Sequence, residues 1–190
     1  MSDTAAKLLS AAASKFAAEG YGATSLAAIA TAAGTTKQVL LHHYRSKADL
    51  YVSVLREVEI RLAAAVTEAQ AACVQPADQL EYVLLSLLAP QNEELVRLTV
   101  HALMAAPSVH NPTRRWPLRP FLESLRTMAK DAAKGPTDDD RAFAAVYGLI
   151  GGVSYYLISR DTLTGMYGKR GHDLLARGFK QDVKARLASL

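Results

Sequence analysis

The stretch Thr24–Leu50, TSLAAIATAAGTTKQVLLHHYRSKADL, decides the architecture of this chain. Two short helical patterns are separated at Gly34, a residue type that adopts a positive φ at little cost. The Ser-Lys-x-Asp sequence at Ser46 then fits the capping box of a third helix. Polar and basic residues gather on the middle helix. This layout predicts a helix-turn-helix whose second helix enters a groove of DNA.

The residues before this stretch predict one more helix, over residues 3–19. Leu8, Ala12 and Phe16 recur every four residues and form an apolar stripe. Gly20 fits the position that follows a helix end. We therefore expect a small helix-turn-helix domain over residues 1–46.

The rest of the chain, residues 47–190, predicts a larger helical domain. A helix over residues 47–73 is about 40 Å long by helical rise and connects the two domains. Further apolar periodicities predict helices at 78–89, 93–105, 117–134, 137–160 and 172–187. The proline-rich segment 106–120 and the glycine-containing segment 163–171 are predicted to contain loops. With no strand pattern in the sequence, we expect an all-α protein of about nine helices.

The charges are distributed unevenly along the chain. Residues 34–50 hold Lys37, Arg45 and Lys47 against one acid, Asp49. Residues 51–113 hold three arginines and no lysine against seven acids. A basic tip beside an acidic middle suits a polyanion that approaches one end, although a modest basic cluster is also typical of any solvated surface.

Composition bounds the other possibilities. Hydrophobic residues make up 50% of 190 residues, enough for a sizeable core. Cys73 is the single cysteine, so an intrachain disulfide is excluded; we expect a small buried side chain and a reducing, cytoplasmic location. No uninterrupted run of about 18 apolar residues occurs, so no membrane partner is expected. The N-terminus also lacks the pattern of a signal peptide.

Motifs for catalysis or for a cofactor are missing from the sequence. It contains no GxSxG, P-loop, HExxH or cysteine–histidine pairing. His42 and His43 are adjacent, so they point about 100° apart on a helix, and no third ligand has metal spacing. We expect neither an enzyme, nor a cofactor, nor a metal site.

With the helices placed, the first 50 residues match a known pattern at Ala12, Phe16, Gly20, Tyr21, Thr24, Ser25, Ile29, Ala30, Ala33, Gly34, Leu40, His42, His43, Ser46, Lys47 and Leu50. In these residues the chain resembles the TetR family of bacterial transcriptional regulators. The resemblance covers about a quarter of the chain; beyond Leu50 only the number and order of helices agree. This chain departs from the family pattern at several positions. Thr35 and Thr36 replace valine and serine, which keeps the hydroxyl at position 36. Gln38 replaces a small residue, Leu41 a tyrosine and Tyr44 a phenylalanine.

The expected DNA contacts fall into two groups. Thr24 and Ser25 open the second helix, whose free N–H groups suit a phosphate, and capping alone explains them equally well. Lys47 can reach the backbone as a point charge. On the helix that follows Gly34, the Gln38 side chain can pair with adenine, Lys37 can reach guanine and the Thr36 methyl can contact thymine. The DNA-binding residues expected are Thr24, Ser25, Thr35, Thr36, Lys37, Gln38, His42, His43 and Lys47. The resemblance implies that Leu41 lacks a phosphate contact, which His42 and His43 can supply.

The resemblance also implies a ligand pocket and a four-helix dimer interface made by the last two helices. Glycines within an apolar helix cost about 1 kcal/mol each relative to alanine, which indicates close approach of another helix, in the same subunit or in a partner. The interface residues expected are Gly148, Gly151, Gly152, Tyr155, Leu175, Phe179 and Val183. Pocket candidates, which could equally be plain core, are Tyr82, His101, Met104, Trp116, Met128 and Tyr147.

The function expected from the sequence is a homodimeric regulator, a repressor of a palindromic operator that a small apolar or aromatic molecule releases. Two alternatives stay open at this stage. The C-terminal domain could be a protein–protein module without a ligand. The chain could also be an all-α enzyme whose N-terminal helices are only structural.

Overall fold

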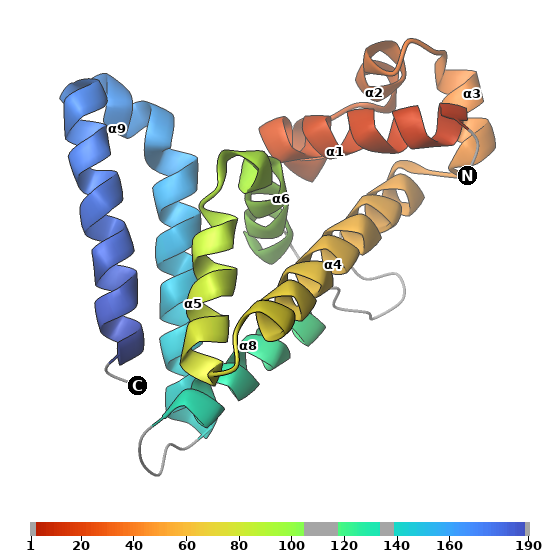
Figure 1. Cartoon of the computed structure of the whole chain (residues 1–190). Coiled ribbons are helices and arrows are strands. Elements are labelled where there is room, and N and C mark those ends of the chain that lie inside the picture. The colour runs from red at the N-terminus through yellow and green to blue at the C-terminus, as the bar shows by residue number, and fades with distance from the viewer. Residues whose placement is uncertain (1–2, 105–117, 134–138, 189–190) are drawn as a thin grey trace. The chain divides into compact units, whose positions relative to one another are not determined.

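The structure, a computed structural model, describes residues 3–104, 118–133 and 139–188 (Figure 1). Within these residues it is all-α, as predicted, with eight α-helices, one short 3-10 helix at Pro90–Asn92 and no strand. The chain divides into two compact units, Met1–Arg61 with Glu94–Leu118, and Leu62–Glu93 with Arg119–Leu190.

The first unit contains the helix-turn-helix. It is built from α1 (Asp3–Ala23), α2 (Leu26–Ala32), α3 (Lys37–His43), the first part of α4 (Lys47–Ala72) and nearly all of α6 (Glu93–Met104). Helices α1, α2 and α3 pack against one another (Figure 1). Its core is made by side chains of the predicted apolar stripes, including Leu8, Ala12, Phe16, Ile29, Leu40 and Leu50.

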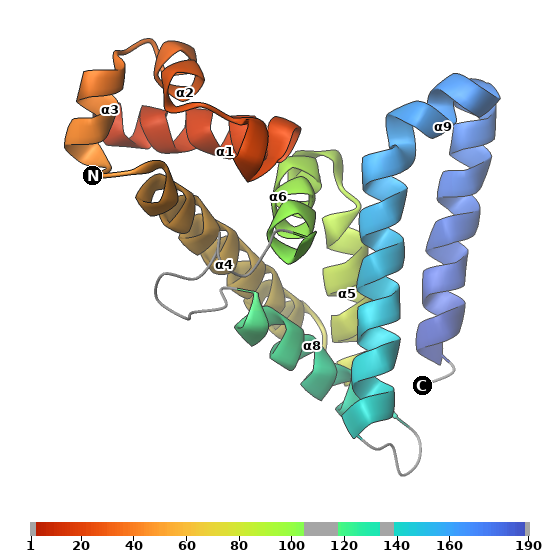
Figure 2. The ribbon, with the colours of Figure 1, turned by 180° about the vertical axis from the view of Figure 1, so that it is seen from behind.

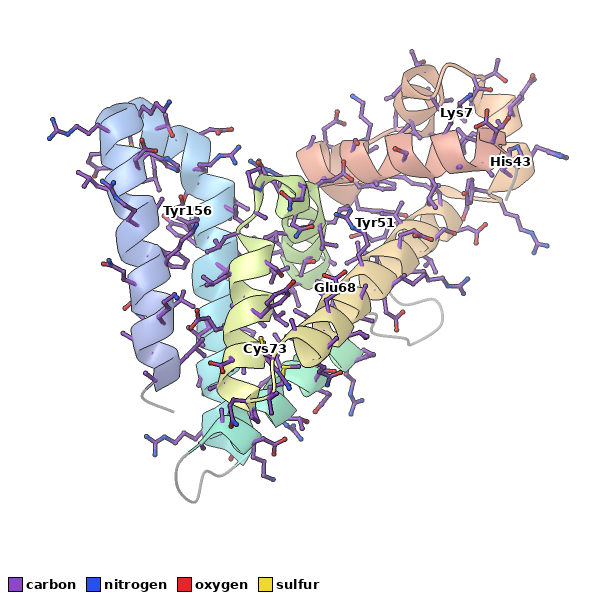
Figure 3. All side chains as sticks on the ribbon, in the orientation of Figure 1. Lys7, His43, Tyr51, Glu68, Cys73 and Tyr156 are labelled. Carbon is purple, nitrogen blue, oxygen red and sulfur yellow. The ribbon has the colours of Figure 1, made fainter. Side chains whose placement is uncertain are left out.

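Three aromatic rings join α1 to α4 in this unit. The ring of Tyr51 lies 4.9 Å from that of Phe16, edge to face, and 4.9 Å from that of Tyr21. Phe16 and Tyr21 are themselves stacked at 6.0 Å. Figure 3 shows Tyr51 on the side of α4 that faces α1. The side chain of Tyr51 is almost fully buried, and this burial raises its pKa to about 12.

The raised pKa of Tyr51 predicts a loss of stability in alkali. The unfolded chain releases the Tyr51 proton near its ordinary pKa of 10, whereas the folded chain retains it to about 12. The contribution of Tyr51 to the free energy of unfolding is therefore fully present below pH 10 and is lost as the pH rises from 10 towards 12. At pH 11 the loss due to this group is about 1.4 kcal/mol. Urea unfolding of the natural chain and of Tyr51→Phe at pH 8 and pH 11 measures the loss due to Tyr51. The variant should lose less stability between the two pH values than the natural chain. Equal losses would contradict the raised pKa of Tyr51.

In the second unit three helices pack against one another. These are α5 (Pro76–Leu87), α8 (Arg119–Ala132) and α9 (Asp139–Ala188), and Figure 2 shows α5 beside the N-terminal part of α9. Pro76 opens α5 at its first turn, where its missing N–H costs no hydrogen bond. The shared core consists of Leu80, Val83, Leu84, Leu87, Phe121, Leu125, Met128, Val146, Leu149, Val153 and Leu157.

The break predicted within residues 163–171 is present, but it is much shorter than the predicted loop. Helix α9 continues through the rest of this segment, and only Gly168 leaves the helical conformation, with φ +69° and ψ 172°. A single residue in this conformation is enough to fold the helix back on itself, so α9 forms two antiparallel arms (Figures 1 and 2). Between them Tyr156 stacks on Phe179 with ring centres 5.1 Å apart, and its hydroxyl lies 3.1 Å from His172 Nε2. Figure 3 shows Tyr156 between the two arms.

One helix of the described residues, Asp140–Ala188, is long and apolar enough to cross a membrane by length and composition alone. The core helix of a soluble protein meets the same criterion, so this is weak evidence for a membrane partner. Most of the proline-rich segment, with Trp116, and the first two residues of the helix predicted over residues 137–160 lie outside the described residues.

Candidate nucleic-acid interface

The N-terminal turn of α3 presents three polar side chains to solvent. Thr36 is the N-cap, with extended φ and ψ of −102° and 156°, and its hydroxyl oxygen accepts a hydrogen bond from the Val39 N–H at 3.3 Å. Leu40 is fully buried and anchors the helix. Because this anchor fixes the rotation of α3, Thr36, Lys37 and Gln38 are all exposed. We call these three residues the reading edge.

The turn between α2 and α3 is held by its backbone. Gly34 has φ +66°, its N–H donates to Thr31 O at 3.0 Å, and the Thr35 N–H donates to Ala30 O at 2.9 Å. A left-handed residue at this place lets the chain reverse directly after α2. Thr35 is half-buried in the turn, which leaves the cap of α3 to Thr36.

Of the two residues predicted at the start of α2, only Ser25 is exposed. Its hydroxyl oxygen accepts from the Ala28 N–H at 3.0 Å, so Ser25 is the N-cap. Thr24 is 2% exposed, and its hydroxyl donates to Gly20 O at 2.8 Å. The Thr24 side chain therefore fastens α2 to the end of α1 and presents no hydroxyl to a phosphate.

Lys47 begins α4 and folds back over the end of α1. Its Nζ donates to Gly22 O at 3.3 Å and lies 4.4 Å from the centre of the Tyr21 ring. Burial lowers the pKa of Lys47 from its ordinary value. The sequence patterns predict no contact between Tyr21 and Lys47, because the two residues are 26 positions apart and nothing local links them.

The predicted capping box at the start of α4 is present with a small change. Ser46 Oγ accepts from the Asp49 N–H at 3.1 Å. The Asp49 carboxylate in return accepts from the Arg45 N–H at 3.2 Å, one residue earlier than the pattern prescribes. The negative charge of Asp49 lies at the positive end of the helix dipole, which adds to the stability of this end.

Leu41 and Tyr44, which depart from the family pattern, lie at the end of α3. Leu41 is 39% exposed and offers no hydrogen-bonding group. Tyr44 is buried, and its hydroxyl donates to Ala5 O at 3.3 Å, so it ties α3 to the first turn of α1. Burial is the main cause that raises the pKa of Tyr44. His42 is exposed and His43 half-exposed, with ring centres 5.5 Å apart. No metal-binding cluster of three or more ligands occurs among the described residues.

Comparisons with known proteins agree with this geometry. Residues 8–54 match the family described as bacterial regulatory proteins, tetR family. This N-terminal segment therefore has the sequence pattern of the TetR family. No curated protein sequence matches it significantly. The matched segment contains the whole of α2, the turn and α3, so it is the DNA-binding helix-turn-helix described above.

Solved structures share the fold over nearly the whole chain at low identity. The fatty acid degradation regulator FadR from Bacillus halodurans is 16% identical, with a TM-score of 0.69 over 97% of this chain and 96% of that one. A putative fatty acid metabolism regulator from Clostridium perfringens is 17% identical, with a TM-score of 0.71 over 97% and 98%. AibR, solved in complex with isovaleryl coenzyme A and operator DNA, is 17% identical, with a TM-score of 0.67 over 82% and 86%.

The predicted ligand-binding residues of this chain have different environments. In the second unit Met128 belongs to the core, whereas Tyr82 and Tyr147 are 40% and 60% exposed. Tyr82 lines a surface cavity of about 490 Å³ together with Cys73, Asp78, Glu81, Leu85 and Ser86, and none of the other candidates lines it. In the first unit Met104 is 80% exposed and the His101 ring lies against Gly20. Trp116 lies outside the described residues.

The predicted interface residues divide into two groups. Val183 is buried within the second unit, and the Phe179 ring lies 3.4 Å from where a Cβ on Gly152 would be. Close packing between the arms of α9 thus explains Gly152, Phe179 and Val183 within one subunit. Gly148 and Gly151 are exposed, and nothing lies within 4 Å of a Cβ added to either. Tyr155 and Leu175 are 70% and 43% exposed.

Proposed function

We propose that this TetR-family regulator is a cytoplasmic, homodimeric repressor that binds a palindromic operator and is released by a small apolar molecule. The observation that carries the proposal is the reading edge. A buried Leu40 and an N-capping Thr36 hold three exposed polar side chains on one short helix, which is what base recognition in a major groove needs. Lys47 adds a positive charge at the start of α4, suited to a backbone phosphate.

Exposed apolar residues on α9 support the proposed dimer. Phe143, Tyr147 and Tyr155 are 41%, 60% and 70% exposed on its first arm, beside the exposed Gly148 and Gly151. Large exposed apolar groups are typical of interaction surfaces. Glycines cost helix stability, and no neighbour among the residues that the structure describes requires Gly148 or Gly151. A second copy of α9 that approaches closely gives them a purpose.

The proposed effector is an apolar molecule, and an acyl group is the first choice to test. Two structures with this fold are described as regulators of fatty acid metabolism or degradation, and a third contains isovaleryl coenzyme A. An effector that binds the folded protein should raise its melting temperature. We expect a rise with fatty acids or acyl-coenzyme A esters and none with coenzyme A alone. No rise with any acyl compound would contradict this effector class and favour a C-terminal domain without a ligand.

Replacement of Gln38 by alanine tests the reading edge. The side-chain amide can form two hydrogen bonds with one adenine, and such a pair contributes about 1–3 kcal/mol of discrimination. We expect Gln38→Ala to relax preference at one base position of each half-site and to leave the other positions unchanged. Competitive binding to a set of single-base operator variants measures this preference.

Gln181→Ala is the matched control for this experiment. Gln181 is exposed on the second arm of α9, so the same change of side chain occurs far from the reading edge in sequence. The control should reproduce the preferences of the natural chain at every position. A Gln38→Ala profile identical to that of the control would remove Gln38 from base recognition.

A further inference from the structure

The ammonium group of Lys47 is held by uncharged partners. Its Nζ donates to the Gly22 carbonyl at 3.3 Å and lies over the ring of Tyr21, 4.4 Å from the centre. Among the described residues no carboxylate lies within ion-pair distance of this nitrogen, because the Asp49 carboxylate accepts from the Arg45 backbone. The positive charge of Lys47 is therefore not neutralised by these parts of the protein.

The Tyr21 ring is itself fixed in place. It stacks on Phe16 with ring centres 6.0 Å apart and meets Tyr51 at 4.9 Å with an angle of 57° between the ring planes. Phe16 and Tyr51 are almost fully buried, whereas Tyr21 is half-buried. Two core aromatic rings thus pack against the Tyr21 ring over which the lysine ammonium lies.

This arrangement prepares Lys47 for an anion. A lysine side chain loses rotamer entropy when it is immobilised, and contact with the ring makes part of that loss before any ligand binds. Of its three N–H donors, one is directed to Gly22 O, which leaves two for a further acceptor. Partial burial also strengthens the attraction of the charge for an anion, because water screens it less.

We propose that Tyr21 is a positioning residue for DNA-backbone binding: its ring holds the Lys47 ammonium beside the Gly22 carbonyl, ready to receive a phosphate. The inference rests on the proposed role of Lys47 in phosphate binding. It requires the aromatic face of Tyr21 and not its hydroxyl. Phenylalanine at position 21 should therefore support DNA binding as well as tyrosine does. Leucine, which is apolar but has no π face, should not.

A double-mutant cycle tests the inference. Operator affinity is measured by fluorescence anisotropy across salt concentrations for the natural chain, Tyr21→Leu, Lys47→Ala and the combined variant. Lys47→Ala should weaken binding about equally on all sequences and reduce the salt slope by about 1. Tyr21→Leu should raise the Kd about threefold with the lysine present, a cation–π contribution, and change it little in the Lys47→Ala background. Tyr21→Phe should match the natural chain.

The outcomes separate the two claims. If Lys47→Ala weakens binding but Tyr21→Leu costs nothing, or costs the same in both backgrounds, Tyr21 acts through packing alone and the positioning role is overturned. If Lys47→Ala leaves affinity and salt slope unchanged, the proposed phosphate contact of Lys47 itself is overturned.

A second measurement does not need DNA. In the free protein the Tyr21 ring should shift the NMR signals of the Lys47 ε-methylene protons upfield. The shift should persist in Tyr21→Phe and disappear in Tyr21→Leu. Signals at ordinary positions in the natural chain would overturn the contact on which the inference depends. All variants are compared well below their unfolding transitions, so that a change in stability does not enter the result.

Discussion

Glutamate in place of Gly151 should keep this protein monomeric and weaken its binding to a two-site operator by about 100-fold or more, the order of the gain that linked binding provides. Gly151 is exposed, and within the described residues nothing beyond its chain neighbours and the adjacent helix backbone lies within 4 Å of a Cβ added to it. A side chain at this position therefore begins in open space in the single subunit. It should even favour the helix by several tenths of a kcal/mol, because glycine is a poor helix former.

Only a partner subunit gives this substitution a cost. If two copies of α9 meet at Gly148 and Gly151, glutamate places a charge and a bulky side chain where the backbones approach most closely. Burial of an unpaired charge opposes association strongly. Sedimentation velocity should then show a dimer for the natural chain and a monomer for Gly151→Glu, with unchanged helical content by circular dichroism.

Gly165→Glu provides the control for Gly151→Glu. Gly165 is also an exposed glycine of α9 with nothing within 4 Å of an added Cβ, and it lies close to the break at Gly168. The Gly165→Glu protein should remain dimeric and bind DNA normally. A Gly151→Glu protein that sediments as a dimer and binds the operator like the control would exclude this face of α9 as the interface.

Alanine in place of Gly20 should destabilise the protein by about 2 kcal/mol or more, for two reasons that add. Gly20 has φ +74° and ψ 171°, a region of backbone conformation that is essentially restricted to glycine. A Cβ at this place would also lie 3.1 Å from His101 Nδ1 and 3.3 Å from Cε1, closer than ordinary contact. Equilibrium unfolding in urea measures the loss.

Neighbouring variants separate the two causes. Gly22→Ala is the control, because Gly22 is exposed and a Cβ there meets nothing within 4 Å. It should change stability by a few tenths of a kcal/mol at most. His101→Ala should recover the steric part of the Gly20→Ala loss and leave the backbone part. A Gly20→Ala protein as stable as Gly22→Ala would show that neither cost exists.

The helix-turn-helix could be predicted because its signals are local. Capping residues, the glycine of the turn and the apolar spacing act within a few positions, so Ser25, Gly34 and Thr36 take conformations that the sequence pattern indicates. Thr35 and Thr36 are adjacent and both carry a hydroxyl, and the structure shows that Thr36 is the cap of α3.

What could not be predicted depends on contacts between distant residues. The Thr24 hydroxyl turns inward to Gly20 O, and Tyr21 meets Lys47 only after α1 and α4 have packed. In α9 the pattern of glycines indicated a loop, yet Gly165 and Gly171 remain within helix and Gly168 alone makes the turn. The exposure of Tyr82, Met104 and Tyr147 likewise follows from packing, which apolar periodicity does not report.

The most direct test of the central claim is selection of binding sites from a library of random DNA duplexes by the purified protein. Two reading edges in a dimer should enrich one inverted repeat, with half-sites separated by about one helical turn or a multiple of it. Binding to that repeat should weaken steeply with salt. A pool without any enriched sequence, or a single unrepeated half-site bound as tightly as the repeat, would contradict the account.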